Sequence, residues 1–354
     1  MWPHSRSPFP FFAVAADDRS TAFNDQRSLT MTRDDDTARK AFAERQRELL
    51  RFYDVPARSR YVGIESPPMR VHLLEAGAGE PLVLIHGGDG EAALWAPLMA
   101  ELAGDFHLHA LDRPGCGLSD PFDYRRTDLR RHAGDYVTSV LDALGLESAT
   151  LVACSMGGYF ALVAALDHPA RVGRLALVGM PVGMSNSAPL PLRVIGGVPG
   201  LSRRFMRTRG TVKAQRAQYR QMFGMDPDAI PEPYLASRVA GVSIPATQDT
   251  WAVLLRRVAG LRGIRPGMYL GEELGGIAAP TLVLWGERDM APIEAGRRET
   301  ARIAGARFAA MTGVGHHPFL EAPAETARLI RELVAAAPRD RGATGDRRGL
   351  AAVG

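Results

Sequence analysis

The sequence predicts an α/β fold in which a mostly parallel sheet carries helices on both faces. Three observations predict it. Short apolar runs such as 81–85 alternate with helical patterns, which is typical of strand–helix–strand units. Glycine-rich turns follow several of these runs, at the positions where strands would end. The alternation stops after residue 180 and resumes near residue 279, so the segment between them is expected to be an insertion.

Apolar runs rich in β-forming residues mark the expected strands. They are 59–64, 69–74, 81–85, 106–111, 149–154, 175–178, 281–286 and 307–311. Continuous apolar runs such as 81–85 are typical of parallel strands that are covered on both faces. Ligands of such sheets bind outside the carboxyl ends of the strands, so the turns at 87–90 and 115–117 are candidate site segments.

Helical periodicity fills the intervals between the strands. The expected core helices are 36–53, the stretch around 94–102, 129–144, 156–166 and 324–336. Residues 181–278 are helical in pattern, interrupted by proline and glycine, and contain no convincing strand. We therefore expect a core formed by 37–180 and 279–337, with a helical cap at 181–278.

Both ends of the chain are expected to be disordered, at 1–36 and 338–354, because they are polar, charged or interrupted by proline. The apolar run 8–16 faintly resembles a signal peptide, which leaves secretion as the alternative to the expected cytoplasmic location. No apolar run reaches the roughly 18–20 residues that span a bilayer, so no membrane span is expected.

Composition excludes several classes of function. The hydrophobic fraction of 46% and the charged fraction of 23% are typical of a globular protein with a sizeable core. The net charge of +4 comes from arginines mixed with acids, without the basic and aromatic runs of a nucleic-acid interface. Cys116 and Cys154 have no metal-ligand spacing and predict no disulfide framework, which suits a reducing compartment.

Ser155 lies where the expected strand 149–154 meets the expected helix 156–166. The residues two positions away, Ala153 and Gly157, are small, as a tight strand–serine–helix turn requires. Such a turn exposes the serine hydroxyl at the end of the sheet. Alone, the pattern also fits an ordinary capped helix without chemistry.

A serine nucleophile needs an imidazole base and an acceptor that orients the imidazole. Asp289 follows the strand 281–286, and His316 follows the last strand and a glycine. Glu287 is the rival acid and His317 the rival base. Ser155, Asp289 and His316 follow one another in the order serine, acid, histidine, although Glu287 and His317 also satisfy this order.

These motifs together resemble the α/β-hydrolase superfamily, in its capped serine-hydrolase form, over residues of about 58 to 336. The matching pieces are 86–88, 112–120, 155–158, 286–289 and 315–316. Ala153 departs from the pattern, because the superfamily usually has glycine there. The replacement should cost little, because the Ala153 methyl group is the smallest side chain that could stand in place of glycine in the turn.

The resemblance implies an oxyanion hole formed by the backbone N–H groups of Gly88 and Met156. The superfamily positions also favour Asp289 over Glu287, which lies two residues early, and His316 over His317, because His316 directly follows a glycine. We expect His86 to be structural, tying the loop that carries Gly88. By the usual role of Asp and Ser in turns, Asp112 and Ser119 are expected to hold theirs.

Apolar residues of the cap and of the neighbouring helix are candidates for the substrate pocket. We expect Trp95, Met180 and Met184 there, although such residues more often belong to the core. Asp89 is expected either to repel anionic substrates or to face solvent.

The serine nucleophile limits the classes of reaction that the chain can catalyse. Haloalkane dehalogenases and epoxide hydrolases have a similar architecture but use aspartate at the elbow, so Ser155 argues against both. We expect a carboxylic-ester hydrolase that acts on a small to medium, apolar small-molecule substrate. The alternatives are a carbon–carbon bond hydrolase of diketone-like compounds, a proline-iminopeptidase-like amidase, and a non-catalytic binder on the same fold. No cofactor and no metal are expected, because neither a dinucleotide fingerprint nor a metal cluster is present in the sequence.

Overall fold

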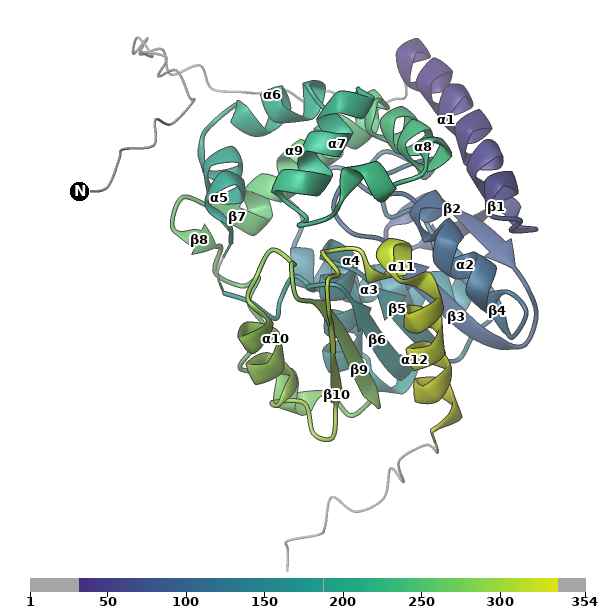
Figure 1. Ribbon diagram of the computed structural model, residues 1–354, viewed down its shortest axis with the longest axis vertical. Helices are drawn as coiled ribbons and strands as arrows, with labels where there is room; N and C mark the ends of the chain where they lie inside the picture. Colours follow the sequence, from purple (N-terminus) through teal and green to yellow (C-terminus); the bar gives the residue numbers. More distant parts are fainter. Residues whose placement is uncertain (1–31, 187, 337–354) are drawn as a thin grey trace, which may run out of the picture.

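The structure, a computed structural model, describes residues 32–186 and 188–336 (Figure 1). Most of the expected leader and all of the expected tail at 338–354 lie outside the described residues. The leader prediction is wrong for its last residues, because α1 (Arg33–Phe52) begins at Arg33. The Thr32 and Asp35 side chains close a capping box there, and acidic residues in the first turn favour a helix start.

One eight-stranded sheet forms the centre of the described chain, in the order β1-β2-β4-β3-β5-β6-β9-β10. Its strands are β1 (Arg58–Glu65), β2 (Pro68–Ala76), β3 (Glu80–Ile85), β4 (Phe106–Leu111), β5 (Ala149–Ala153), β6 (Val172–Val178), β9 (Thr281–Gly286) and β10 (Arg307–Met311). The β1–β2 and β2–β4 pairs are antiparallel, and the other neighbours are parallel. The predicted fold class is confirmed, and each expected strand is present.

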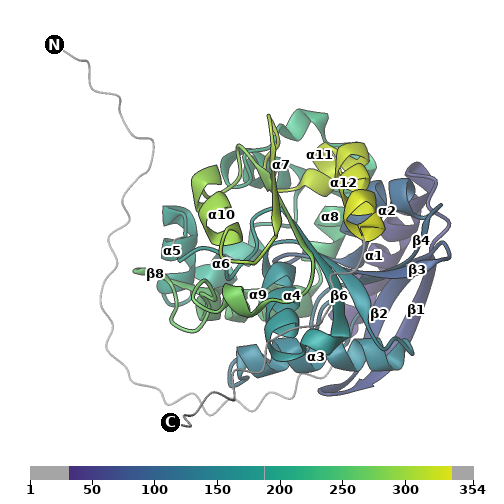
Figure 2. The same ribbon diagram turned by 90° about the horizontal axis from the view of Figure 1, so that it is seen from below.

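Helices cover the sheet on both faces, as Figure 2 shows for α2 and α12 on one side and α3 and α4 on the other. The first face packs against α1, α2 (Ala96–Leu102) and α12 (Pro323–Ala335) in one apolar cluster. The second packs against α3 (Leu129–Ala143) and α4 (Met156–Asp167). Two further helices, α10 (Ile293–Thr300) and α11 (Pro318–Glu321), were not expected from the sequence.

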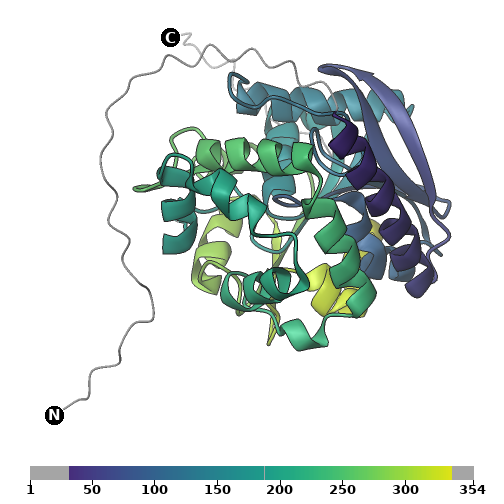
Figure 3. The same cartoon turned by 90° about the horizontal axis from the view of Figure 1, so that it is seen from above.

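The insertion forms a cap on one side of the molecule, visible at the top of Figure 1 and from above in Figure 3. It contains α5 (Leu190–Gly197), α6 (Leu201–Arg207), α7 (Val212–Gln221), α8 (Glu232–Val242) and α9 (Pro245–Val258). It also contains β7 (Ala259–Gly260) and β8 (Gly263–Ile264), which pair with each other. The expectation of a cap without strands is therefore wrong for this short hairpin.

Helix α1 joins the cap to the core. It packs along α8, and the Asp35 carboxylate accepts a hydrogen bond from the Ala246 N–H at 2.9 Å. On the core side, the Arg39 guanidinium donates to the Ser119 carbonyl at 2.9 Å. Among the helices that the structure describes, none is long and apolar enough to cross a membrane.

Candidate active site

Ser155 occupies a strained turn between β5 and α4. Its backbone has φ 52° and ψ −117°, a combination that costs about 1–3 kcal/mol for a residue with a side chain. Gly157 makes the turn possible, because a Cβ at that position would lie 2.1 Å from the Ile85 carbonyl oxygen. Ala153 is fully buried at the end of β5. A backbone this strained persists at functional sites, where its surroundings fix it.

The structure brings Asp289 and His316 together. Asp289 Oδ1 lies 2.7 Å from His316 Nδ1, and both side chains are buried. The carboxylate also accepts hydrogen bonds from the Met180 N–H at 2.8 Å and the Met290 N–H at 2.6 Å, so its orientation is fixed. With Nδ1 engaged, Nε2 is the imidazole nitrogen that remains for a reaction partner. Ser155 and His316 line the same cavity.

The rival acid lies elsewhere. Glu287 is exposed, and its carboxylate accepts hydrogen bonds from the Thr312 hydroxyl and the Gly313 N–H, both at 3.1 Å. These contacts hold the turn after β10 and leave Asp289 as the acid beside a histidine.

The rival base, His317, also lines the cavity, but in an aromatic setting. Its ring packs against Tyr219, Phe223 and Phe319 at centroid distances of 5.7, 4.9 and 4.9 Å. Burial, together with His316 and Arg238, holds the pKa of His317 well below its usual range, so the ring is neutral. No carboxylate of the described residues is hydrogen-bonded to the His317 ring.

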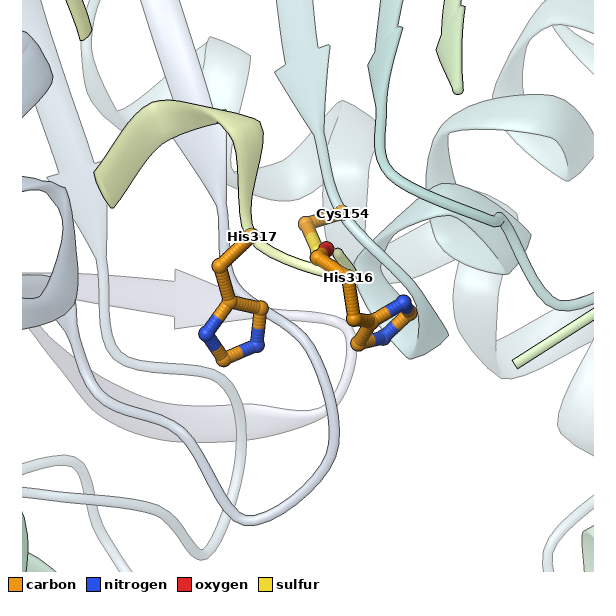
Figure 4. Close-up of side chains that lie close together, drawn as sticks. All are labelled: Cys154, His316 and His317. Carbon is orange, nitrogen blue, oxygen red and sulfur yellow. The ribbon is translucent and has the colours of Figure 1, made fainter. Parts of the chain in front are cut away.

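Cys154 lies near both histidines, as Figure 4 shows, but its thiol sits beside the main chain of His316. Its Sγ lies 4.0 Å from the His316 carbonyl oxygen. Burial raises the pKa of this thiol well above its usual range. A metal ligand must be the thiolate, and His316 Nδ1 already engages Asp289, so this trio is a poor metal site.

The loop after β3 is fixed by its carbonyl groups. The Gly87 oxygen accepts hydrogen bonds from His86 Nδ1 at 2.8 Å, from the Gly90 N–H at 3.0 Å and from the Arg113 guanidinium at 3.1 Å. In a trans peptide the C=O and the next N–H point in opposite directions. The three donors therefore turn the Gly88 N–H away from Arg113.

Arg113, which is fully buried, supports the rest of this loop. The Arg113 guanidinium donates to the His86 carbonyl at 3.0 Å and to the Gly88 carbonyl. The backbone N–H of Arg113 donates to His86 Nε2 at 2.9 Å. Burial, together with Arg113, lowers the pKa of His86 to about 3. His86 is thus a neutral, buried ring that bonds to its own loop, in the structural position expected for it.

Met156 is the first residue of α4, and its side chain packs in the core. Only its backbone N–H, one of the free donors at a helix start, is therefore available at the turn. Gly88 lines the cavity, and a Cβ there would lie 3.3 Å from the Trp251 ring. Both expected oxyanion donors thus lie in the two segments that adjoin Ser155.

Asp112 and Ser119 hold their turn, as expected. The Asp112 carboxylate accepts hydrogen bonds from His72 Nδ1 at 2.7 Å and from the N–H groups of Ala92 and Leu118 at 2.6 and 2.8 Å. The Ser119 hydroxyl donates to the Asp112 carbonyl at 2.7 Å.

Of the three expected pocket residues, only Met180 lines the cavity. Trp95 is fully buried in the short helix after the loop, and its ring packs 4.5 Å from that of Phe319. Met184 is fully buried in the apolar cluster on the sheet face that α3 and α4 cover. The placement of Trp95 and Met184 in the pocket is therefore wrong, because both fill the core. Trp251 of α9 contributes the tryptophan of the cavity.

A buried cluster of charges forms part of the cavity wall. Asp89 pairs with Arg209 at 2.8 Å and with Arg238 at 2.6 Å. Arg238 also pairs with Glu91 at 2.8 Å. All four side chains are at least nine-tenths buried, so the expectation that Asp89 faces solvent is wrong.

The charges of this cluster do not cancel at neutral pH. Burial raises the pKa of Asp89, but Arg209 and Arg238 outweigh it and the net pKa is lowered, so Asp89 is ionised. Burial raises the pKa of Glu91 to about 8, against the effect of Arg238. The raised pKa favours the protonated form of Glu91. In that form two guanidinium groups face one carboxylate, and the cluster is net positive.

The chain is similar to known hydrolases. A model of the alpha/beta hydrolase family matches residues 82–329. A 2-hydroxy-6-oxononadienedioate/2-hydroxy-6-oxononatrienedioate hydrolase from Paraburkholderia phymatum is 32% identical over 274 residues, which cover 73% of this chain and 90% of the relative. A 2-hydroxy-6-oxo-6-phenylhexa-2,4-dienoate hydrolase from Comamonas testosteroni is 29% identical over 275 residues, covering 73% and 89%.

Solved structures share the fold. A carboxylesterase from Bacillus subtilis has a TM-score of 0.68 at 21% identity, covering 84% of this chain and 99% of that chain. A 2-hydroxy-6-oxo-6-phenylhexa-2,4-dienoate hydrolase from Rhodococcus has a TM-score of 0.67 at 23% identity, covering 80% and 100%. The names of the relatives favour the carbon–carbon bond alternative over the ester hydrolase that the sequence led us to expect first.

Proposed function

Because this chain belongs to the alpha/beta hydrolase family, we propose that Ser155, His316 and Asp289 are its catalytic triad. Ser155 is the nucleophile, His316 Nε2 takes the serine proton, and Asp289 orients the imidazole. The 2.7 Å contact between Asp289 and His316 supports these roles. The N–H groups of Gly88 and Met156 stabilise the oxyanion that forms on attack.

We further propose that the substrate is a 2-hydroxy-6-oxo-dienoic acid with one carboxylate and an apolar group beyond the 6-oxo carbon. The observation that carries this proposal is a mostly apolar cavity wall that also contains buried cations. Arg209 and Arg238 supply positive charge to that wall. Apolar side chains make up much of the rest of the lining, among them those of Leu192, Trp251 and Leu255. A carboxylate in a buried cavity needs such a positive charge.

The reaction breaks the bond between carbons 5 and 6. A proton first moves from the 2-hydroxyl group to carbon 5, which converts the 2-hydroxydienoate into a 2-oxo-3-enoate. Ser155 Oγ then adds to the carbon of the 6-oxo group, and its proton passes to His316. The tetrahedral intermediate collapses, and the electrons of the bond between carbons 5 and 6 pass through the 3,4 double bond to the 2-oxo oxygen, which takes up a proton. Water then cleaves the acyl-enzyme. A carboxylic acid and a hydroxydienoate result.

Carboxylic-ester hydrolysis is the second candidate. The same triad and oxyanion donors serve it, and the apolar lining of the cavity suits an uncharged ester. The buried arginines distinguish the two functions, because a neutral ester gains nothing from their positive charge.

The test compares kcat/KM for three substrates. We expect 2-hydroxy-6-oxo-6-phenylhexa-2,4-dienoate to react faster than 2-hydroxy-6-oxonona-2,4-dienedioate, because the cluster balances one carboxylate. Both should react faster than p-nitrophenyl butyrate. Hydrolysis of the ester alone would overturn the dienoate proposal and leave the ester hydrolase.

A fluorophosphonate probe tests whether the site is catalytic at all. We expect it to label the native protein and not the folded Ser155→Ala variant. Absence of labelling in both would favour a non-catalytic binder.

A further inference from the structure

A group of metal-ligand side chains lies on strands β2 and β4, away from the cavity. It consists of Glu75 on β2 and of His107 and His109 on β4. We propose that these three residues bind one divalent transition-metal ion, with Zn²⁺ as the representative ion.

The strand pairing places the three side chains on one face of the sheet. His107 and His109 are two residues apart on β4, so their side chains point to the same side. Glu75 pairs directly with His109 across the antiparallel β2–β4 ladder. The backbone therefore fixes the relative positions of the three ligands, and no loop has to order when the ion binds.

The distances are close to those of a metal site. One ligand atom from each residue lies within 4.8 Å of the others. Ligands about 2.1 Å from a tetrahedral zinc ion are about 3.4 Å apart, so small side-chain rotations suffice. His107 Nε2 and Glu75 Oε1 are already 2.8 Å apart, and the rings of His107 and His109 have centroids 4.2 Å apart.

His109 supplies an independent indication of a ligand. Its side chain is only 3% exposed, and neither ring nitrogen has a hydrogen-bond partner among the described residues. Most buried polar atoms in proteins have a hydrogen-bond partner, and leaving one without a partner destabilises the fold. A metal ion bound to one of these ring nitrogens would give that nitrogen a partner. The His107 side chain is 35% exposed, which gives the ion a route from solvent.

The ligand set suggests the class of metal. Two imidazoles and one carboxylate suit zinc, nickel, copper or cobalt, whereas calcium and magnesium prefer oxygen ligands. One contact opposes binding: the Arg60 guanidinium lies 2.9 Å from Glu75 Oε2 and must move or tolerate the ion.

The test is zinc binding to the full-length protein by isothermal titration calorimetry. His109→Leu and Glu75→Gln should each weaken binding about 100-fold or more. Arg60→Gln should tighten it several-fold, because a competing positive charge is removed from Glu75. His132→Leu is the matched control, since His132 is also buried with an unpartnered ring nitrogen but belongs to no ligand group; it should leave binding unchanged.

Hydrolase activity separates this site from the histidines of the cavity. Zinc bound at Glu75, His107 and His109 should leave turnover unchanged, whereas zinc on His316 should inhibit. Unchanged zinc affinity in both His109→Leu and Glu75→Gln would overturn the proposal, as would binding that only ever accompanies inhibition.

Discussion

Replacing Arg113 by methionine should impair catalysis without touching the reacting atoms. The guanidinium holds the carbonyls of His86, Gly87 and Gly88, and the Gly87 carbonyl sets the direction of the Gly88 N–H. Without the guanidinium, the Gly87–Gly88 peptide is held by fewer hydrogen bonds and the Gly88 N–H is less well directed. Complete loss of one oxyanion donor costs about 2.7–4 kcal/mol in the barrier, or about 100- to 1,000-fold in kcat, so we expect a loss of kcat up to that size.

The same change should also destabilise the fold. The Gly87 oxygen keeps two donors, His86 Nδ1 and the Gly90 N–H. The other two carbonyls lose the guanidinium, at about 1–3 kcal/mol for each buried group, so we expect a loss of about 2–6 kcal/mol in the free energy of unfolding. Urea unfolding measures it.

Arg257→Met is the matched control. The Arg257 guanidinium also donates to three carbonyls, those of Tyr124, Arg125 and Thr127, but none of these lines the cavity. It should lose stability and retain kcat, measured on the substrate that the native protein hydrolyses best. The reasoning fails if Arg113→Met keeps kcat within about twofold of the native value, or if both variants lose kcat equally.

Three further predictions follow from the site. His316→Ala should lower kcat about 10⁴-fold or more, whereas His317→Phe, which keeps the aromatic packing, should stay within about tenfold; a reversed result in steady-state assays would exchange their roles. Glu91 has a folded pKa of about 8 against about 4.5 unfolded, so the unfolded chain loses this proton first and the free energy of unfolding falls from pH 4.5 to 8. Glu91→Gln should remove that fall, and equal slopes in urea unfolding at several pH values would refute the assignment. Met180→Ala should raise KM several-fold and also cost stability, because Met180 lines the cavity and is buried, while Trp95→Phe should lower Tm and leave KM unchanged; an altered KM in Trp95→Phe would return Trp95 to the pocket.

The sequence predicts the sheet and the order of its strands along the chain, because buried parallel strands are continuous apolar runs. The turn at Ser155 was also predictable, since its small neighbours lie within two residues. Asp289 and His316 follow strands that end on the same edge of the sheet, so their meeting could be inferred from topology alone.

Other features depend on contacts between distant residues and leave no local pattern. Asp89 and Arg238 are 149 residues apart, and the sequence around either residue gives no pattern that predicts their ion pair. Trp95 packs against Phe319, which is even more remote in sequence. Helix α10 has a mostly polar sequence, and it packs because Gly296 lets it approach Trp285, where a Cβ would lie 2.5 Å from the ring.

Helix α1 also bears on how the cavity can open. It contacts the cap along α8 and at Ala246, and it contacts the core at Ser119. Arg257 of α9 adds a second connection, through three carbonyl groups of the core. The main contacts of α5 and α6 are with other elements of the cap, and α5 lies on the side of the cap opposite α1 (Figures 1 and 3). Since Leu192 of α5 lines the cavity, we expect the opening for substrate and product to form at α5.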